Sequence, residues 1–355
     1  MTQSFDELMP ESITILGDGA MATVCSVLLS QRGYDVVMWG AFEESIDRLI
    51  QNRENRRFLP GVRVPKNVRL TASDIDCFEH ASLVLSAVPT QYMRDVWQRV
   101  GRHLPVGVPI VSVAKGIENN TLLRPTQIIA DVLSKKGKMR PDAAPKCDWP
   151  LAVLSGPNIA AELARYLPAT SVAASQEIEL AQRVQSIFST EWLRVYTNGD
   201  VLGVELAGAT KNIVAIAAGI IDGLAAGSNA KAALVTRGLV EITRLGLAMG
   251  AQEATFNGLA GLGDLITTCI SGDSRNRRVG EQIGKGRRLA DILKEMNSVA
   301  EGVSTTQSVR ELGRRYGVEM PITEAVYAVL FENKDVLAAL SELMSRDPKR
   351  ERTGI

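Results

Sequence analysis

Histidine and cysteine are scarce in this chain of 355 residues, which contains two histidines and four cysteines. No two cysteines form a CxxC pair, so the sequence predicts neither a disulfide framework nor a zinc site. We therefore expect no bound metal and reduced cysteines, as in a cytoplasmic protein. The cysteines are Cys25, Cys77, Cys147 and Cys269.

An excess of charge of one sign is also missing, because 40 Lys and Arg residues balance 40 Asp and Glu residues. A balanced chain lacks the basic field that attracts nucleic acid, so we expect no nucleic-acid partner. The N-terminus is acidic and has no apolar core, which argues against a signal peptide. The longest apolar stretch, Val201–Leu224, contains charges and glycines that argue against a membrane span.

The length of the chain predicts two domains, because a single hydrophobic core seldom serves more than about 250–300 residues. Strand and helix patterns alternate as far as the turn signal Asn198-Gly199, and the pattern is almost entirely helical after it. We therefore expect a Rossmann-type α/β dinucleotide-binding domain over residues 1–198 and an all-helical substrate domain over residues 199–355. We expect a homodimer, because the helical half has ample apolar surface for one.

A glycine-rich turn follows the first predicted strand, Ser12–Leu16, and reads Gly17-Asp18-Gly19-Ala20-Met21-Ala22. In a βαβ unit, Gly17 permits the tight turn, Gly19 lets a pyrophosphate approach the backbone, and Ala22 allows close helix–strand packing. The pattern predicts NAD or NADP at the N-terminus of the helix, although such a turn can also serve packing alone. The next strand, Asp35–Trp39, ends without the acid typical of NAD sites or the arginine typical of NADP sites, so the preference stays open.

The same half contains other buried runs that predict strands. We expect loops at Asn52–Arg69 and Lys135–Asp148 and a helix at Ile159–Tyr166. Lys115 lies two residues after the run Pro109–Val113 and is therefore placed at the carboxyl edge of a parallel sheet, where α/β proteins bind ligands. The alternative is a loop lysine in water. The other predicted strands are 81–88, 151–154, 170–173 and 192–196.

In the helical half, Val201–Leu224 predicts a helix of about six turns that is apolar around most of its circumference and therefore buried. Burial lowers the pKa of a lysine, and a lysine near neutrality can take a proton from an alcohol, which makes Lys211 a candidate base. The alternative is that Lys211 extends to the surface.

Three further segments stand out after this helix. Gly258–Asp264 is too rich in glycine for a helix interior, and Val299–Val303 is predicted as a turn beside an acid. Ser274–Arg278 reads SRNRR and predicts either a phosphate clamp, because guanidinium groups match phosphate oxygens, or a solvated basic start of a helix.

Together these segments resemble the soluble, bacterial type of NAD(P)-dependent glycerol-3-phosphate dehydrogenase. The resemblance extends from Ile13 to about Met344 and rests on GDGAMA, AKG, SGPN, ELAGATKN, GLAGLGD, SRNRR, VAEGV and MPITEAVY, which occur in this order. It implies reversible hydride transfer between NAD(P)H and dihydroxyacetone phosphate, which supplies glycerol 3-phosphate for phospholipid synthesis in the cytoplasm.

The resemblance also implies roles for individual residues, with Lys211 as the proton acceptor. The implied substrate contacts are Lys115, Gly156, Asn158, Lys211, Asp264, Ser274, Arg275 and Asn276. Besides Gly17, Gly19 and Ala22, the implied cofactor contacts are Ala20, Met21, Lys115, Ala160, Arg275, Val299 and Glu301. The chain departs from the family pattern at Ala20 and Met21, where serine and an aromatic residue are usual, at Asn158, where serine or threonine is usual, and near Ala41, where a basic residue is often found.

Two alternatives remain at this level. One is another two-domain dehydrogenase, of the 3-hydroxyacid or 6-phosphogluconate type, which also pairs a dinucleotide domain with a helical domain bearing a catalytic lysine. The other is a dinucleotide sensor without catalysis, suggested by the departures at Ala20 and Met21.

Overall fold

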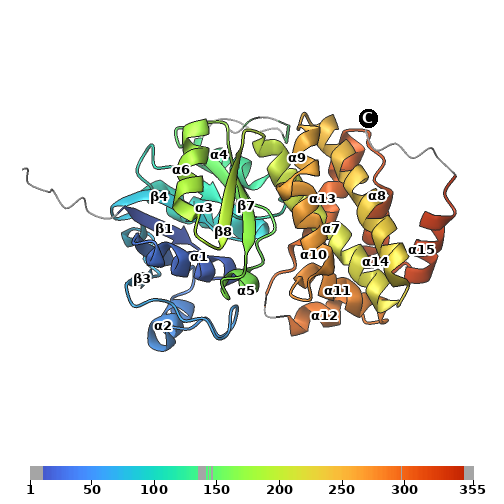
Figure 1. Ribbon diagram of the computed structural model, residues 1–355, viewed down its shortest axis with the longest axis horizontal. Helices are drawn as coiled ribbons and strands as arrows, with labels where there is room; N and C mark the ends of the chain where they lie inside the picture. The colour runs from blue at the N-terminus through green and yellow to red at the C-terminus, as the bar shows by residue number, and fades with distance from the viewer. Residues whose placement is uncertain (1–10, 135–140, 143, 145–146, 297, 348–355) are drawn as a thin grey trace, which may run out of the picture.

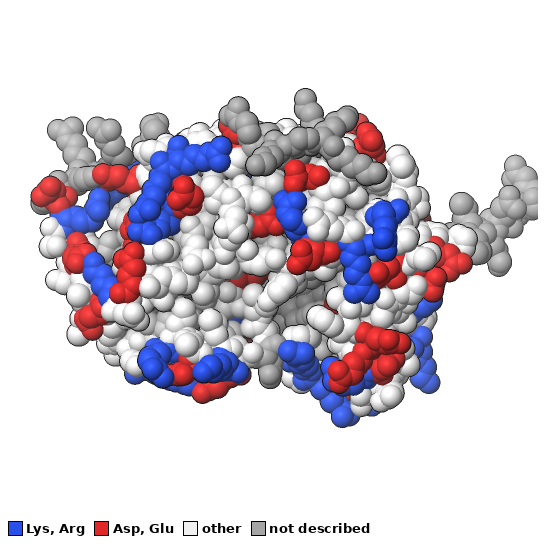
Figure 2. Space-filling model, turned by 180° about the vertical axis from the view of Figure 1, so that it is seen from behind, with Lys and Arg blue, Asp and Glu red and all other residues white. Residues whose placement is uncertain are grey.

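The computed structural model describes residues 11–134, 141–142, 144, 147–296 and 298–347. Most of the predicted insertion Lys135–Asp148 therefore lies outside the described residues. A sheet-containing half and an all-helical half lie side by side (Figure 1), as the sequence predicts. On the opposite face, acidic and basic side chains are interspersed (Figure 2), in keeping with the balanced charge.

The first half contains, within the described residues, one eight-stranded sheet in the order β3-β2-β1-β4-β5-β6-β7-β8. All neighbouring strands are parallel except β6 and β7. The strand order reverses beside β1, and ligands of such sheets bind at this switch point. The strands are β1 (Ser12–Leu16), β2 (Asp35–Trp39), β3 (Val68–Thr71), β4 (Ala81–Ser86), β5 (Ile110–Ser112), β6 (Leu151–Ser155), β7 (Ala169–Ser175) and β8 (Leu193–Asn198).

Helices cover both faces of the sheet. The strands are therefore buried on both sides, which explains why they are apolar throughout. One buried cluster joins the sheet to α1, α2, α5 and α6, and a second joins it to α3 and α4. The helices are α1 (Ala20–Gln31), α2 (Glu43–Asn52), α3 (Thr90–Val100), α4 (Pro125–Ser134), α5 (Ala160–Leu163) and α6 (Ile178–Phe188), with 3-10 turns at Asp76–Phe78 and Gly101–His103.

Two predictions for this half are corrected. The expected loop Asn52–Arg69 ends in strand β3, which pairs with β2 although arginine and proline dominate its surroundings. The expected helix Ile159–Tyr166 stops at Leu163, and Tyr166 has a positive φ of 58° that a helix does not permit.

The second half surrounds α7 (Val201–Gly223), which is a buried core helix; 94% of its most apolar window is inside the protein. Asp200 caps this helix by accepting a hydrogen bond from the Gly203 amide, at 2.8 Å. The other helices are α8 (Gly227–Ala248), α9 (Glu253–Asn257), α10 (Asp264–Ile270), α11 (Arg275–Gly284), α12 (Leu289–Glu295), α13 (Glu301–Arg315), α14 (Pro321–Phe331) and α15 (Val336–Met344).

Two expected loops in this half are helical. Leu259–Gly263 forms a π-helical turn that runs into α10, and a Cβ on Gly261 would lie 2.1 Å from the carbonyl oxygen of Phe256. The glycines therefore permit a close backbone approach and do not break the helix. Glu301, expected in a turn, is the first residue of α13.

The two halves join where α7 meets the sheet. Val201 and Val204 at the start of α7 pack against Val153 and Val172 of β6 and β7. A buried ion pair between Arg124 and Glu205 ties the segment before α4 to α7. These contacts fix the start of α7 against the carboxyl-terminal part of the sheet half.

Candidate active site

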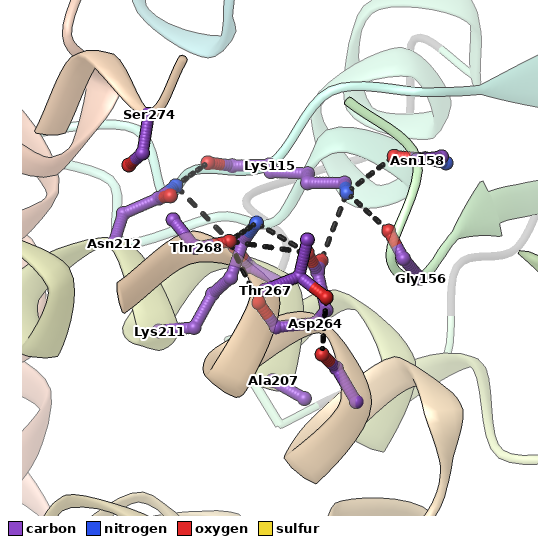
Figure 3. A network of polar contacts seen from close by, with 12 residues as sticks. Lys115, Gly156, Asn158, Ala207, Lys211, Asn212, Asp264, Thr267, Thr268 and Ser274 are labelled. Atoms are coloured by element: carbon purple, nitrogen blue, oxygen red, sulfur yellow. Dashed lines mark hydrogen bonds and ion pairs between the residues drawn. The ribbon is translucent and has the colours of Figure 1, made fainter. Parts of the chain in front are cut away.

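Two lysines from different halves of the molecule meet at one carboxylate. Lys211, on α7, donates a hydrogen bond to Oδ1 of Asp264 at 2.6 Å, and Lys115, in the loop after β5, donates to Oδ2 at 2.8 Å (Figure 3). Asp264 is the first residue of α10. The side chains of Lys211 and Asp264 are only 7% and 2% exposed. The prediction that Lys211 is buried is therefore confirmed, and the surface alternative is wrong.

This arrangement changes the acidity of the groups. Burial lowers the pKa of Lys211 to about 8; nearby Asp264 opposes the shift and the positive charge of Lys115 adds to it. Burial alone would raise the pKa of Asp264, but the two ammonium groups outweigh it and hold that pKa below its usual value. The carboxylate is therefore ionised near neutral pH, while Lys211 exists in both protonation states.

Thr268 is a contact of Lys211 that the sequence analysis missed. Its hydroxyl accepts from the Lys211 amine at 2.6 Å and donates to the backbone oxygen of Asp264 at 2.7 Å. The bond to the backbone directs a lone pair of the hydroxyl toward the amine. The spacing of one helical turn after Asp264 could have indicated it, but only with the helical character of that segment known.

Lys115 also binds the loop after β6. Its amine donates to the carbonyl oxygen of Gly156 at 2.9 Å and to Oδ1 of Asn158 at 2.8 Å. The amide of Asn158 in turn donates to Ser171 at 3.2 Å, and the amide of Asn212 donates to the backbone oxygen of Lys115 at 3.0 Å. The predicted residues Lys115, Gly156, Asn158, Lys211 and Asp264 thus form one connected network (Figure 3).

The SRNRR segment begins α11. Ser274 is the N-cap and accepts from the Arg277 amide at 3.3 Å. Asn276 is buried and accepts from the Gly302 amide at 3.0 Å. Arg275 is exposed and has no hydrogen-bond or ion-pair partner among the described residues, whereas Arg277 is bound to Asp222 at 2.7 Å. Of these arginines, Arg277 is thus committed to a structural contact and Arg275 is available to a ligand.

A hollow of about 540 Å³ lies close to this network. It is lined by Glu162 of α5, by Thr267 and Ile270 of α10, and by the loop 271–273 that leads to Ser274. The hollow therefore opens between the two halves, beside the segment that carries Arg275.

The glycine-rich turn has the features that a dinucleotide diphosphate requires. Gly17 has φ 122°, and a Cβ there would lie 2.9 Å from the carbonyl oxygen of Ala87. A Cβ on Gly19 would meet no atom within 4 Å, so the space above the turn is open. Within the part of the chain that the structure describes, no side chain caps α1, which leaves the amides of its first turn, including those of Ala20 and Met21, available for an anion.

Asn55 supports this turn and was not identified from the sequence. Its amide donates to the backbone oxygen of Asp18 at 2.7 Å and to Thr23 at 2.8 Å. Asn55 lies in the segment that was expected to be a solvated loop, and nothing in its local pattern marks it as buried.

The remaining predicted cofactor residues lie on three other segments. Glu301 accepts from the Thr90 amide at 2.8 Å and so connects α13 to the N-terminus of α3. Val299 is half-buried just before α13, and Ala160 is the half-buried first residue of α5. Among the described residues, no hydrogen bond or ion pair joins these three directly to the lysine network.

Comparison with known proteins supports one enzyme family. Residues 12–181 match the family model of the N-terminus of NAD-dependent glycerol-3-phosphate dehydrogenase, and residues 200–341 match that of its C-terminus. A glycerol-3-phosphate dehydrogenase [NAD(P)+] of Chlorobium limicola is 47% identical over 340 residues, which cover 96% of this chain and 99% of that protein. A second, from Salinibacter ruber, is 48% identical over 344 residues, 97% of each chain.

A solved structure agrees with these matches. The crystal structure of glycerol-3-phosphate dehydrogenase from Coxiella burnetii has a TM-score of 0.88 and 33% identity, and the similarity covers 95% of this chain and all of that one. More distant structures, such as a ketopantoate reductase from Ralstonia eutropha at 14% identity and a TM-score of 0.57, share the fold alone.

Proposed function

The chain belongs to the NAD(P)-dependent glycerol-3-phosphate dehydrogenase family, and from that premise we propose that Lys211 exchanges the proton of the reaction. The enzyme interconverts glycerol 3-phosphate and dihydroxyacetone phosphate, with NAD(P) as the hydride carrier. Membership of this family decides against the 3-hydroxyacid and 6-phosphogluconate types and against a sensor without catalysis.

The observation that supports this role is the buried amine of Lys211 with a pKa of about 8. General acid–base catalysis is most effective when the pKa of the group lies near the working pH. In the reductive direction, the ammonium form donates a proton to the nascent alkoxide and stabilises its negative charge. In the oxidative direction, the neutral amine accepts the proton of the alcohol.

Asp264 and Thr268 orient the amine in this proposal. Asp264 contacts both lysines, so it holds Lys211 in place and balances part of their positive charge. Lys115, with Gly156 and Asn158, would bind substrate oxygen atoms on the side of the sheet half. The substrate then lies between the halves, where their approach excludes water.

The phosphate is assigned to the start of α11. Ser274, Arg275 and Asn276 lie at this N-terminus, where helix amides and the dipole favour an anion. The guanidinium of Arg275, which is not paired with another described residue, can bind phosphate oxygens in the bidentate manner that gives both affinity and orientation. The hydroxyl of Ser274 and the amide of Asn276 add neutral donors.

For the cofactor, we assign the diphosphate to the turn formed by Gly17, Gly19, Ala20, Met21 and Ala22. Because backbone amides do the binding there, the side chains of Ala20 and Met21 need not supply donors. Lys115, Ala160, Arg275, Val299 and Glu301 are assigned to the end of the cofactor that faces the substrate.

Further proposals concern the setting of the enzyme. We place the domain boundary at residues 198/199, between the end of β8 and the start of α7. We also propose that the enzyme is a homodimer and is located in the cytoplasm. Its proposed role there is to supply glycerol 3-phosphate for phospholipid synthesis.

The direct test is the reduction of dihydroxyacetone phosphate by the purified protein, measured in parallel with NADH and NADPH. We expect turnover with at least one cofactor, and the ratio of the two rates gives the preference. Turnover with 3-hydroxyacids or 6-phosphogluconate instead, or NAD(P)H binding without turnover, would contradict the proposal.

A further inference from the structure

Helices α7 and α11 are in backbone contact through glycines. A Cβ on Gly280 of α11 would lie 1.9 Å from the carbonyl oxygen of Ile216 of α7, and one on Gly219 of α7 would lie 1.9 Å from the carbonyl oxygen of Arg277. Packed helices are usually 8–10 Å apart, and small residues allow a closer approach. No side chain, alanine included, fits at these positions without moving one helix.

The contacts also define how the two helices align. Gly280 lies against Ile216, and one turn later Gly284 lies against Ile220. A Cβ on Gly284 would lie 2.5 Å from the carbonyl oxygen of Ile220. The two helices therefore run in the same direction. Asn276 lies one turn before Gly280 on α11, and Asn212 lies one turn before Ile216 on α7. A Cβ on Gly302 of α13 would lie 2.8 Å from both the carbonyl oxygen of Asn212 and Oδ1 of Asn276, so Asn212 and Asn276 are at the same level along the two helices.

This alignment brings the two functional helix positions to one level. Lys211 immediately precedes Asn212 on α7, and Arg275 immediately precedes Asn276 on α11. An ion pair between Arg277 of α11 and Asp222 of α7, at 2.7 Å, also links the two helices and supports this alignment. The bond from the Gly302 amide to Asn276 adds α13 to the same junction.

We propose that the glycine contact between α7 and α11 fixes the distance from the Lys211 amine to the phosphate anchor at Arg275, and thereby selects a three-carbon phosphate ester. The proposal rests on the function assigned to Lys211 and Arg275 above. Because close-packed interiors transmit strain, we expect an outward movement of α11 at Gly280 to displace Arg275 as well. Catalysis is sensitive to such movements, because a misplacement of about 1 Å can cost about a hundredfold in rate.

The test is the variant Gly280→Ala, assayed with dihydroxyacetone phosphate and with dihydroxyacetone, which lacks the phosphate. We expect kcat/KM for the phosphate ester to fall by about tenfold to a hundredfold. The value for dihydroxyacetone and the Kd of NAD(P)H should stay within about twofold. A merely structural defect would lower both substrates together, so the ratio of the two kcat/KM values is the decisive quantity.

The matched control is Gly238→Ala on α8, in which a new methyl group crowds the side chain of Val214 on another face of α7 and does not meet its backbone. This variant should keep the wild-type ratio. Gly284→Ala, one turn farther from Arg275, serves if Gly280→Ala does not fold, and it should change the ratio in the same direction.

An unchanged ratio in a folded Gly280→Ala or Gly284→Ala variant, or an equal loss for both substrates, would overturn the proposal. Failure of the assigned function gives a different result. If the wild-type enzyme does not prefer the phosphate ester, or if Arg275→Lys leaves that preference intact, the phosphate anchor itself is misassigned.

Discussion

The two halves of the molecule present different chemistry to their ligands. At the glycine-rich turn of the sheet half, backbone amides face open space beside Gly19. In the helical half, the functional groups are the side chains of Lys211, Asp264 and Thr268, packed in the interior of the protein. A backbone site tolerates side-chain changes such as those at Ala20 and Met21, whereas a buried side-chain site depends on each member.

The comparison predicts the largest effect at Lys211. Replacing it with alanine removes the proton donor and leaves Asp264 without one of its two ammonium partners. We expect kcat to fall by about 10²–10⁴-fold, the usual contribution of a general acid or base. The Kd of NAD(P)H, measured by fluorescence titration, should stay nearly the same, since the cofactor turn lies in the other half. Near-normal turnover would refute the assignment.

The reciprocal change is Gly19→Val at the cofactor turn. The Cβ of a side chain there would meet no described atom within 4 Å, and it would point into the open space in which the diphosphate is proposed to lie. We expect the Kd of NAD(P)H to rise by about tenfold or more and the thermal midpoint of unfolding to change little. The pH dependence of the remaining activity should be that of the wild type. An unaltered Kd would remove the turn from the cofactor site.

A smaller effect is expected at the phosphate. Arg275→Lys keeps the positive charge but loses the planar pair of donors, so KM for dihydroxyacetone phosphate should rise by about tenfold while kcat changes less. Steady-state kinetics at saturating cofactor measure this. Arg288→Lys is the matched control, because Arg288 is an exposed arginine that pairs with Asp291 at 3.0 Å and lies outside α7 and α11. If KM is the same in Arg275→Lys and the wild type, Arg275 does not bind the phosphate.

The sequence predicted the sheet half and the central helix well, because both depend on local patterns. Buried strands read as apolar runs, and the turn at Gly17 has a fixed spacing that follows from its geometry. The segments that were mispredicted depend on contacts between distant residues. The glycines of Leu259–Gly263 read as helix breakers until the backbone of Phe256 is seen beside Gly261.

In the candidate site, too, single residues could be predicted from local patterns, whereas the contacts between them could not. A lysine in an apolar helix was visible in the sequence, and so was a lysine at the end of a strand. Their meeting at Asp264 required the packing of α10 against α7, which no spacing in the sequence reveals. Thr268 and Asn55 were missed because their functional contacts are set by neighbours in space.

The central claim is that Lys211, with a pKa near 8, carries the proton, and the pH dependence of kcat/KM in both directions tests it most directly. Reduction requires the ammonium form, so its rate should fall as the pH rises through about 8; oxidation requires the neutral amine, so its rate should rise over the same interval. In Asp264→Asn, the loss of a carboxylate that raises the pKa of Lys211 should move both midpoints to lower pH. Profiles without opposite inflections near pH 8, or midpoints that do not move in Asp264→Asn, would contradict the account.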